Sequence, residues 1–397
     1  MNAPFSPPSP FDLCRRAEIY SILDQVCRDL EPTETQLDRL RSAYESVGDW
    51  IAGSADPLLS STKVYLHGSV ATGTTIRPIG RMEFDGDVVC LLKAVSRTVG
   101  PGKVKAALGQ RLREHGFYAG ILEEKKRCWR LDYAGDFHLD VSPTIANELC
   151  FQGGELVPDK ALADWHPTNP SGFRDLFRRR AALKPRLLGR SFANARDGSA
   201  EPFPSSVTLG AILHRIVQLL KRHRDEYFLH VKEEIAPISV IITTLAMRAY
   251  EQCVASQVFV DELDVVIETI RLMPYFIERI EVDRRLHYAI WNETTRGENF
   301  AERWNSEPNR AQAFFRWHAT AFADFEALRD AVGMDVVRRQ LTAALGDRIA
   351  NRVMDRRIDA ISQARRAGGL YAAPAIGLTT APAAGATPVR PNDFFGD

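Results

Sequence analysis

The stretch that decides the fold is HGSVATGTTIRPIGRMEFDGDVVCLL, residues 67–92. It places Gly68 and Ser69 before a group of threonines, and then sets Asp85 and Asp87 one residue apart at the head of an apolar run. Two interpretations fit this pattern. It is either a surface hairpin, for which Asp-Gly is a common turn signal, or a phosphate-binding turn followed by a metal site. Residues elsewhere in the chain help to distinguish them.

The aspartates favour the metal site, because side chains alternate between the two faces of a strand. Asp85 and Asp87 therefore point the same way, and Gly86 places no side chain on the opposite face. The apolar run after Asp87 also lacks the matching strand that a hairpin needs directly before it. A third carboxylate, Asp140 in FHLDVSP, stands at the end of a predicted strand between apolar neighbours, where an unpaired charge is costly. A strand-end cap is the alternative for Asp140.

Three converging carboxylates repel one another strongly unless cations lie between them. Two Mg²⁺ ions about 3.5 to 4 Å apart would relieve the repulsion, and Mg²⁺ prefers such hard oxygen ligands. We therefore predict that Asp85, Asp87 and Asp140 are catalytic residues that bind two Mg²⁺ ions, with Mn²⁺ as the alternative metal.

The Gly-Ser turn is predicted to bind phosphate. Gly68 permits a positive φ and a close approach of the backbone, and Ser69 adds a hydroxyl and amides ahead of a helix whose amino end favours anions. The chain has no GxxxxGK[ST] pattern here, which argues against a P-loop ATPase. The alternative is that Ser69 is an ordinary turn residue. Its assignment to phosphate binding depends on the aspartates that follow.

Composition indicates a soluble globular protein of 397 residues, 45% hydrophobic and 26% charged. Lys plus Arg and Asp plus Glu both number 51, so no global field attracts nucleic acid or anionic lipid. The six cysteines show no CxxC pair and no zinc spacing, which fits a reducing compartment. The start of the chain lacks signal-peptide features, and the most apolar segment, residues 238–247, is too short to span a membrane. We expect a cytoplasmic protein that does not associate with membranes.

The chain divides into four expected segments. Residues 1–10 carry four prolines and predict a disordered leader; residues 11–205 have a mixed α and β pattern; residues 206–366 have a helical pattern; and residues 367–397, rich in Ala, Pro, Gly and Thr, predict a flexible tail. The expected fold class is therefore α+β, with a mixed sheet that carries the aspartates and a helical lobe packed against it.

Local patterns predict the individual elements. Thr33 and Gln36 form a capping box at the start of a helix, residues 63–66 and 87–92 are predicted strands, and residues 127–141 predict a hairpin. Further helices are predicted over residues 104–115, 209–224, 238–252, 260–272 and 300–345, the last interrupted near Pro308.

The turn at Gly68-Ser69 with Thr74, the Asp85-Gly86-Asp87 triplet and Asp140 together resemble the polymerase-β type of nucleotidyltransferase. More narrowly, three stretches of the second half are similar to the helical lobe of the CD-NTase family. This family comprises the bacterial relatives of cyclic GMP-AMP synthase, which make cyclic oligonucleotides in the anti-phage systems called CBASS. The stretches are LKRHRD at 220–225, PISVIITTL at 237–245 and ENFAERW at 298–304, and the resemblance runs over roughly residues 15–330.

The resemblance implies a polymerase-β-like nucleotidyltransferase core over residues 11–205 and an active site in the cleft beside the helical lobe. It implies that Ser69 contacts the donor triphosphate and that Lys221 and Ser239 reach the same phosphates from the lobe. Without it, Lys221 and Ser239 fit solvated or core-capping groups. The implied substrates are ATP and other nucleoside triphosphates, and the implied partners are proteins of the defence system. A ribose hydroxyl would attack an α-phosphate, release pyrophosphate and, after a second attack, give a cyclic di- or trinucleotide.

Several alternatives stay open. The chain could modify a macromolecule, such as an RNA 3′ end or a protein, or it could bind nucleotides without catalysis.

The arginine-rich run at residues 174–190 fits either a site for a nucleic-acid activator or product, or a solvated helix face, and the scarcity of aromatic residues favours the solvated face. The ending PVRPNDFFGD, residues 388–397, fits either a plain flexible tail or, as the resemblance implies for some systems of this family, a carboxyl terminus that a ubiquitin-like transfer enzyme joins to other molecules. Asp397 departs from the small terminal residue that such joining implies. The bases joined, the linkage and the ring size are not defined by the sequence.

Overall fold

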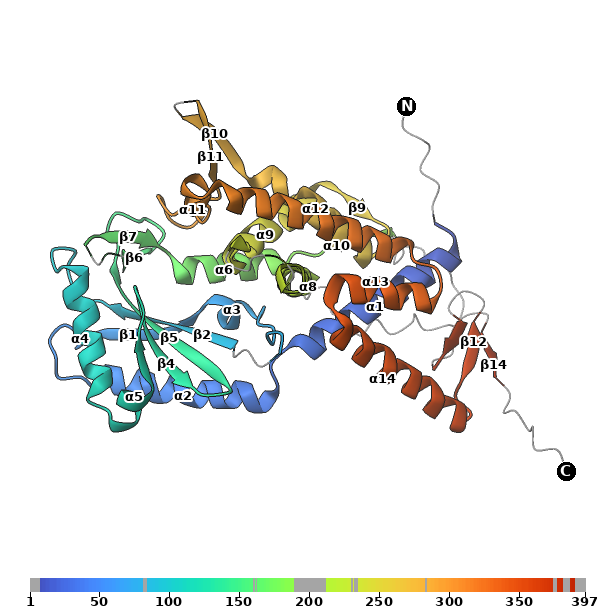
Figure 1. Ribbon diagram of the computed structural model, residues 1–397, viewed down its shortest axis with the longest axis horizontal. Coiled ribbons are helices and arrows are strands. Elements are labelled where there is room, and N and C mark those ends of the chain that lie inside the picture. Colours follow the sequence, from blue (N-terminus) through green and yellow to red (C-terminus); the bar gives the residue numbers. More distant parts are fainter. Residues whose placement is uncertain are drawn as a thin grey trace.

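The computed structural model describes residues 8–80, 84–159, 161, 163–188, 212–229, 231, 235–282, 284–373, 377–380 and 386–389. Figure 1 shows a core built on a sheet, which lies beside a lobe of helices. The predicted α+β fold class, with a mixed sheet packed against a helical lobe, is confirmed.

The described strands of the core form a seven-stranded sheet. Its main path runs β1-β2-β5-β4-β3, and β6 and β7 extend it from β5. The β2–β5 pair is parallel, whereas the other neighbouring pairs are antiparallel, which makes the sheet mixed. The strands are β1 (Thr62–His67), β2 (Phe84–Leu92), β3 (Leu122–Glu124), β4 (Trp129–Tyr133), β5 (Phe137–Ala146), β6 (Glu155–Pro158) and β7 (Trp165–Thr168).

The predicted strands at residues 63–66 and 87–92 and the predicted hairpin at residues 127–141 are confirmed as β1, β2 and the β4–β5 pair. β2 begins three residues earlier than expected, because Phe84 already pairs with Phe137 of β5 and is buried in the core. As a result, Asp85 lies within the strand together with Asp87.

Helices cover both faces of this sheet (Figure 1). The predicted capping box is present: the Thr33 side chain accepts from the Gln36 backbone, and the Gln36 side chain accepts from the Thr33 backbone. The helix that follows buries Leu40, Val47 and Ile51 in the core of the sheet. The helices of the core are α2 (Glu34–Ala52), α3 (Gly68–Thr72), α4 (Pro101–Arg113), α5 (Gly116–Ile121) and α6 (Pro170–Ala181).

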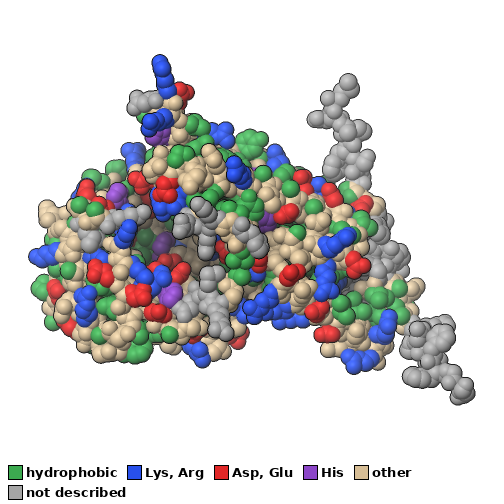
Figure 2. Space-filling model, viewed as in Figure 1, with side chains coloured by type: hydrophobic (Ala, Val, Ile, Leu, Met, Phe, Trp, Pro, Cys, Tyr) green, Lys and Arg blue, Asp and Glu red, His purple; other side chains and the backbone are tan. Residues whose placement is uncertain are grey.

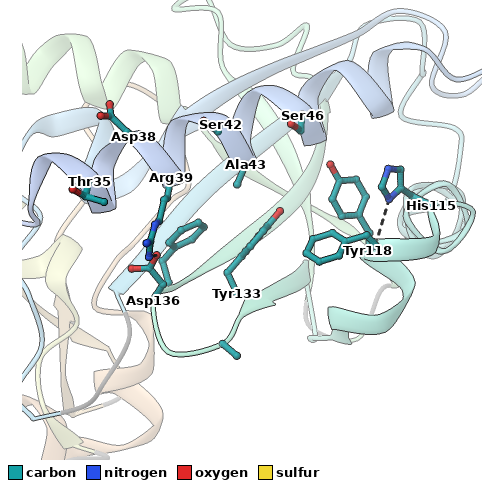
Figure 3. Close-up of a pocket in the computed structure, with 13 residues that line it drawn as sticks. Thr35, Asp38, Arg39, Ser42, Ala43, Ser46, His115, Tyr118, Tyr133 and Asp136 are labelled. Atoms are coloured by element: carbon teal, nitrogen blue, oxygen red, sulfur yellow. Dashed lines mark hydrogen bonds and ion pairs between the residues drawn. The ribbon is translucent and has the colours of Figure 1, made fainter.

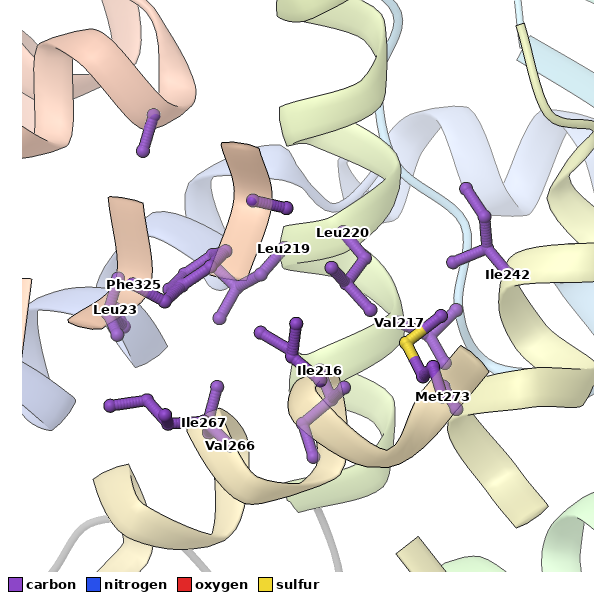
Figure 4. Packing of buried hydrophobic residues seen from close by; sticks show 14 of the residues in the cluster. Leu23, Ile216, Val217, Leu219, Leu220, Ile242, Val266, Ile267, Met273 and Phe325 are labelled. Carbon is purple, nitrogen blue, oxygen red and sulfur yellow. The ribbon is translucent and has the colours of Figure 1, made fainter. Parts of the chain in front are cut away.

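A second, larger cluster of buried side chains holds the helical lobe together. Figure 4 shows part of it, with Leu23 of α1, Leu219 of α8 and Phe325 of α12. The helices of this lobe are α1 (Pro10–Leu30), α8 (Ile212–Leu229), α9 (Ser239–Ser256), α10 (Glu262–Leu272), η3 (Met273–Phe276), α11 (Glu302–Ser306), α12 (Pro308–Asp330), α13 (Met334–Leu345) and α14 (Asp347–Arg366). Short strands β8 (Arg186–Leu187) and β9 (Val258–Phe259) pair in parallel, and a projecting hairpin joins β10 (Glu278–Val282) to β11 (Arg285–Ala289).

The structure divides the chain differently from the expected segments. α1 begins at Pro10, within the expected leader, and its buried side chains pack in the lobe cluster rather than in the core of the sheet. Phe173 and Phe177 of α6 also belong to the lobe cluster, where the Phe173 ring packs against Phe300 and the Phe177 ring against His214 of α8. The lobe is therefore assembled from both ends of the chain. The expected boundary at residues 205–206 and residues 1–7 of the leader lie outside the described residues.

Part of the expected flexible tail, residues 367–397, has regular structure. β12 (Tyr371–Ala373) pairs with both β13 (Gly377–Thr379) and β14 (Thr387–Pro388). Leu370 is buried, and its carbonyl accepts a hydrogen bond of 2.8 Å from the Val389 backbone. This pairing joins the described parts of the tail to one another, while residues 390–397 lie outside the described residues. Among the described helices, none has the length and apolar character to cross a membrane.

Candidate active site

A cavity of about 350 Å³ lies between the sheet and the helical lobe. All seven site residues predicted from the sequence line it, namely Gly68, Ser69, Asp85, Asp87, Asp140, Lys221 and Ser239. Figure 2 shows the surface hollowed between the core and the lobe, with acidic and basic side chains beside the hollow. The fold therefore brings together residues that are up to 171 positions apart in the sequence, from Gly68 to Ser239.

The β2–β5 pair sets three carboxylates on one face of the sheet. Asp87 lies directly opposite Asp140 in the parallel register, and Asp85 lies two residues earlier on β2. On the other face there is no room for a side chain at Gly86, where a Cβ would come within 2.7 Å of Leu40 Cδ1 in α2. The glycine thus allows α2 to pack closely behind the aspartates.

The carboxylates carry more negative charge than their surroundings balance. The pKa of Asp87 is raised to about 6, first by its burial and then by repulsion from Asp85 and Asp140, although Lys221 and Arg130 oppose the rise. Asp85 is at the mouth of the cavity, with 57% of its side chain exposed, whereas only 19% of Asp140 is exposed. Such a cluster of hard oxygen donors fits divalent cations.

Arg130 of β4 is a cation that sequence reasoning missed at this cluster. It lies opposite Asp140 in the β4–β5 register. Its Nε donates to Asp140 Oδ1 at 2.7 Å, its Nη2 donates to Asp140 Oδ2 at 2.8 Å, and the same Nη2 lies 3.4 Å from Asp85 Oδ1. As the side chains lie here, no group of three Asp, Glu, His or Cys residues among the described residues is arranged to hold a metal ion.

The Gly-Ser turn lies against the same carboxylates. Gly68 has φ +65°, and a Cβ at this position would lie 1.9 Å from Asp87 Oδ2, so only glycine fits. The Ser69 hydroxyl accepts a hydrogen bond of 3.1 Å from the Thr75 hydroxyl, and the Ser69 carbonyl accepts one of 2.9 Å from the Thr74 backbone. The turn is therefore held in place by the threonines that follow it.

The helical lobe contributes the opposite wall of the cavity. Lys221 of α8 is 5% exposed, and its Nζ donates to the carbonyl of Thr74 at 3.0 Å. Its pKa is lowered to about 8, chiefly by burial and then by the nearby Arg224. Arg224 in turn donates to the Ser239 hydroxyl at 2.9 Å. Lys221 and Ser239, the two lobe residues implied by the resemblance, thus line the same cavity as the Gly-Ser turn.

The amino end of α9 at this cavity was also missed from the sequence. Ser239 is the first residue of α9, and Ile238 at the N-cap position makes no side-chain capping bond. Ser239, Val240 and Thr243 of the first turn line the cavity, as does Arg224. Uncapped amides at a helix amino end favour anions. The signal in the sequence is the apolar Ile238, since polar residues are preferred at an N-cap.

The arginine run at residues 174–190 does not form a single basic face in its described part. Arg180 is only 6% exposed and pairs with Glu251 and Glu293. Arg174 pairs with Asp175 at 2.9 Å, and Arg190 lies outside the described residues. The run's other described basic residues, Arg178, Arg179, Lys184 and Arg186, are exposed, so the segment is a surface stretch with one arginine buried in ion pairs.

A larger groove of about 860 Å³ lies between α2, α5 and the β4–β5 hairpin (Figure 3). Aromatic rings, including Tyr118 and Tyr133, line one side, and the polar face of α2 lines the other. Its acidic residue Asp136 pairs with Arg39 at 3.1 Å. This groove contains none of the predicted site residues, and we assign the chemistry to the smaller cavity.

Comparison with known proteins agrees with this assignment. Residues 18–180 match the Second Messenger Oligonucleotide or Dinucleotide Synthetase domain. A c-di-GMP synthase of Roseivirga ehrenbergii is 30% identical over 389 residues, which cover 96% of this chain and 98% of that protein. The matched domain contains the Gly-Ser turn and the three aspartates.

Solved structures show the same fold. The CD-NTase CdnG of Bradyrhizobium diazoefficiens, in complex with GTP, has a TM-score of 0.65 and 21% identity, covering 85% of this chain and 97% of that chain. CdnC of E. coli MS115-1, with ATP, has a TM-score of 0.58 and 15% identity, covering 82% and 97%. The chain therefore belongs to the CD-NTase family and is a nucleotidyltransferase that makes a cyclic oligonucleotide second messenger from nucleoside triphosphates.

Proposed function

We propose that this enzyme joins two molecules of GTP into cyclic di-GMP and releases pyrophosphate in each of two steps. The observation that carries the proposal is that one cavity is lined by three carboxylates on the sheet side and by Lys221, Arg224 and Ser239 on the lobe side. The choice of GTP is supported by the relative that is a c-di-GMP synthase, and by the CdnG structure, whose bound nucleotide is GTP.

Asp85, Asp87 and Asp140 would hold two Mg²⁺ ions, or Mn²⁺ as the alternative. The fit rests on three oxygen-donor side chains that share one face of the sheet, and on the burial and the carboxylate repulsion that together raise the pKa of Asp87. When bound, such ions lower the pKa of an attacking hydroxyl and offset the charge that develops on the phosphates.

The side chains of this enzyme would position the donor triphosphate. The turn at Gly68 and Ser69 would hold the β- and γ-phosphates from the sheet side, while Lys221 and Ser239 would contact the same phosphates from the lobe side. Holding both ends of the triphosphate fixes the α-phosphate beside the carboxylates, where the ribose hydroxyl of the second nucleotide can attack in line. The linear product would stay in the cavity for the second attack, which closes the ring.

We also infer that the product is an anti-phage signal and that the enzyme works in the cytoplasm. The six cysteines are all free, which fits a reducing compartment. Partner proteins of a defence system remain a prediction. A nucleic-acid activator is not favoured, because Arg180 in the middle of the arginine run is buried in ion pairs.

The test is to incubate the full chain with Mg²⁺ and all four nucleoside triphosphates, one of them α-labelled at a time, and then to analyse phosphatase-resistant products by mass spectrometry. We expect label from GTP alone in a product with the mass of cyclic di-GMP. Label from another nucleotide in a small product would correct the choice of base, and label in RNA or protein would favour the macromolecule-modifying alternative.

A further inference from the structure

Arg130 holds the carboxylate oxygens of Asp140 that a metal ion would need as ligands. Its guanidinium takes both oxygens of that carboxylate, at 2.7 and 2.8 Å, and lies 3.4 Å from Asp85 Oδ1. The pairing is set by the backbone, since Arg130 and Asp140 face each other in the β4–β5 register. The arrangement is therefore part of the sheet and does not depend on a mobile loop.

The contact is partly shielded from solvent. The exposed fraction is 23% for the Arg130 side chain and 19% for the Asp140 side chain, so water screens this pair less than it screens a surface pair. Paired, two-point hydrogen bonds between guanidinium and carboxylate are among the stronger contacts in proteins. Asp140 is thus firmly held away from any other cation.

A metal ion and this guanidinium compete for the same oxygens. Mg²⁺ binds carboxylate oxygen at about 2.0 to 2.1 Å and tolerates little distortion. An ion at that distance from Asp140 would lie within a few ångströms of the Arg130 charge, and the two positive charges would repel each other strongly in this partly buried site. Each cation therefore weakens the contact of the other with Asp140, although a carboxylate oxygen has two lone pairs.

We propose that Arg130 is an internal counter-cation, which holds Asp140 in the metal-free enzyme and opposes the binding of metal ions there. Arg130 is thus a positioning residue that keeps the metal affinity of the nucleotide-free enzyme low. This inference rests on the proposed metal site at Asp85, Asp87 and Asp140.

The test measures Mn²⁺ binding to the full chain without nucleotide, by following free Mn²⁺ with electron paramagnetic resonance. In Arg130→Gln the competing charge is gone, so we expect the dissociation constant for Mn²⁺ to fall about tenfold or more. Arg130→Lys keeps the charge but cannot hold both oxygens in the same way. Its dissociation constant for Mn²⁺ should lie between those of wild type and Arg130→Gln. Arg39→Gln is the matched control, since it breaks the Arg39–Asp136 pair in the larger groove between α2, α5 and the β4–β5 hairpin. This variant should bind Mn²⁺ like wild type.

Thermal unfolding gives a second readout that does not depend on activity. Arg130→Gln leaves the carboxylates without their guanidinium partner in EDTA, so its melting temperature should rise more on addition of Mg²⁺ than that of wild type. If Arg130→Gln fails to fold, Arg130→Lys carries both measurements, with a smaller shift in the same direction.

Equal or weaker Mn²⁺ binding by Arg130→Gln, or no binding by either protein, would overturn the role of Arg130. Asp87→Asn separates this failure from failure of the proposed function. If Asp87→Asn loses Mn²⁺ while Arg130→Gln matches wild type, only the Arg130 inference fails. If Asp87→Asn binds Mn²⁺ as wild type does, the metal site itself is wrong.

Discussion

At the scale of a single residue, Gly68 allows the Gly-Ser turn to lie directly against the Asp87 carboxylate. Its φ is +65°, and a Cβ would lie 1.9 Å from Asp87 Oδ2. We expect Gly68→Ala to lower the free energy of unfolding by about 1 to 3 kcal/mol and the rate of product formation by about 100-fold or more, because Asp87 has to move. Thermal unfolding and steady-state turnover measure the two effects.

The control for Gly68 is Gly135→Ala. Gly135 has φ +81° but nothing within 4 Å of its Cβ position, so this variant introduces the backbone strain without displacing a carboxylate. We expect it to be destabilised but close to wild type in turnover. Similar turnover in the two variants would contradict the crowding argument.

Lys221 gives the site a pH dependence. Its pKa is lowered to about 8 by burial, so the ammonium is lost as the pH rises through 8 rather than near 10.5. The affinity of the enzyme for GTP should therefore fall by roughly tenfold between pH 7 and pH 9. Lys221→Met should bind GTP more weakly and show a flatter profile. Equilibrium binding of GTP across this range is the measurement, and a profile unchanged by the substitution would contradict a phosphate contact from Lys221.

At the scale of elements, the uncapped amino end of α9 faces the cavity. Ile238→Asn should cap the helix and raise the free energy of unfolding by about 0.5 to 1 kcal/mol, while leaving GTP binding nearly intact. Ile238→Asp should cap it equally well but place a negative charge at the phosphate site. We expect GTP to bind about tenfold more weakly to the Asp variant than to the Asn variant. Equal affinities in a titration would show that the helix end does not face the phosphates.

The strands show which parts of the site the sequence could predict. Alternation along a strand is local, so the common orientation of Asp85 and Asp87 followed directly from their spacing. Arg130 falls within the hairpin predicted at residues 127–141. Its position opposite Asp140 depends on the register between two strands, which residue patterns alone did not define.

The helices show the same limit. Lys221 and Ser239 were assigned from a family resemblance, because a lone lysine or serine on a helix is usually solvated. Arg224, three residues after Lys221, was missed for that reason, although it bonds Ser239. Residue patterns also did not tell which hydrophobic core α1 joins.

At the scale of the whole molecule, the active site is shared between two separately packed bodies. The carboxylates and the Gly-Ser turn come from the sheet core, whereas Lys221 and Ser239 come from the helical lobe. α1 places the start of the chain in that same lobe. The relative position of the two bodies therefore determines the distance between the phosphate-binding groups and the carboxylates.

The most direct measurement of the central claim is pyrophosphate release and cyclic product formation by Asp87→Asn, which removes one charge from the carboxylate cluster. The matched control is Asp136→Asn. Asp136 lies in the turn between β4 and β5, but it lines the larger groove rather than the active-site cavity. We predict that Asp87→Asn folds normally and loses about 1000-fold or more in rate, while Asp136→Asn keeps near wild-type activity. Retention of more than a few per cent of wild-type activity by Asp87→Asn would contradict the assignment of the active site.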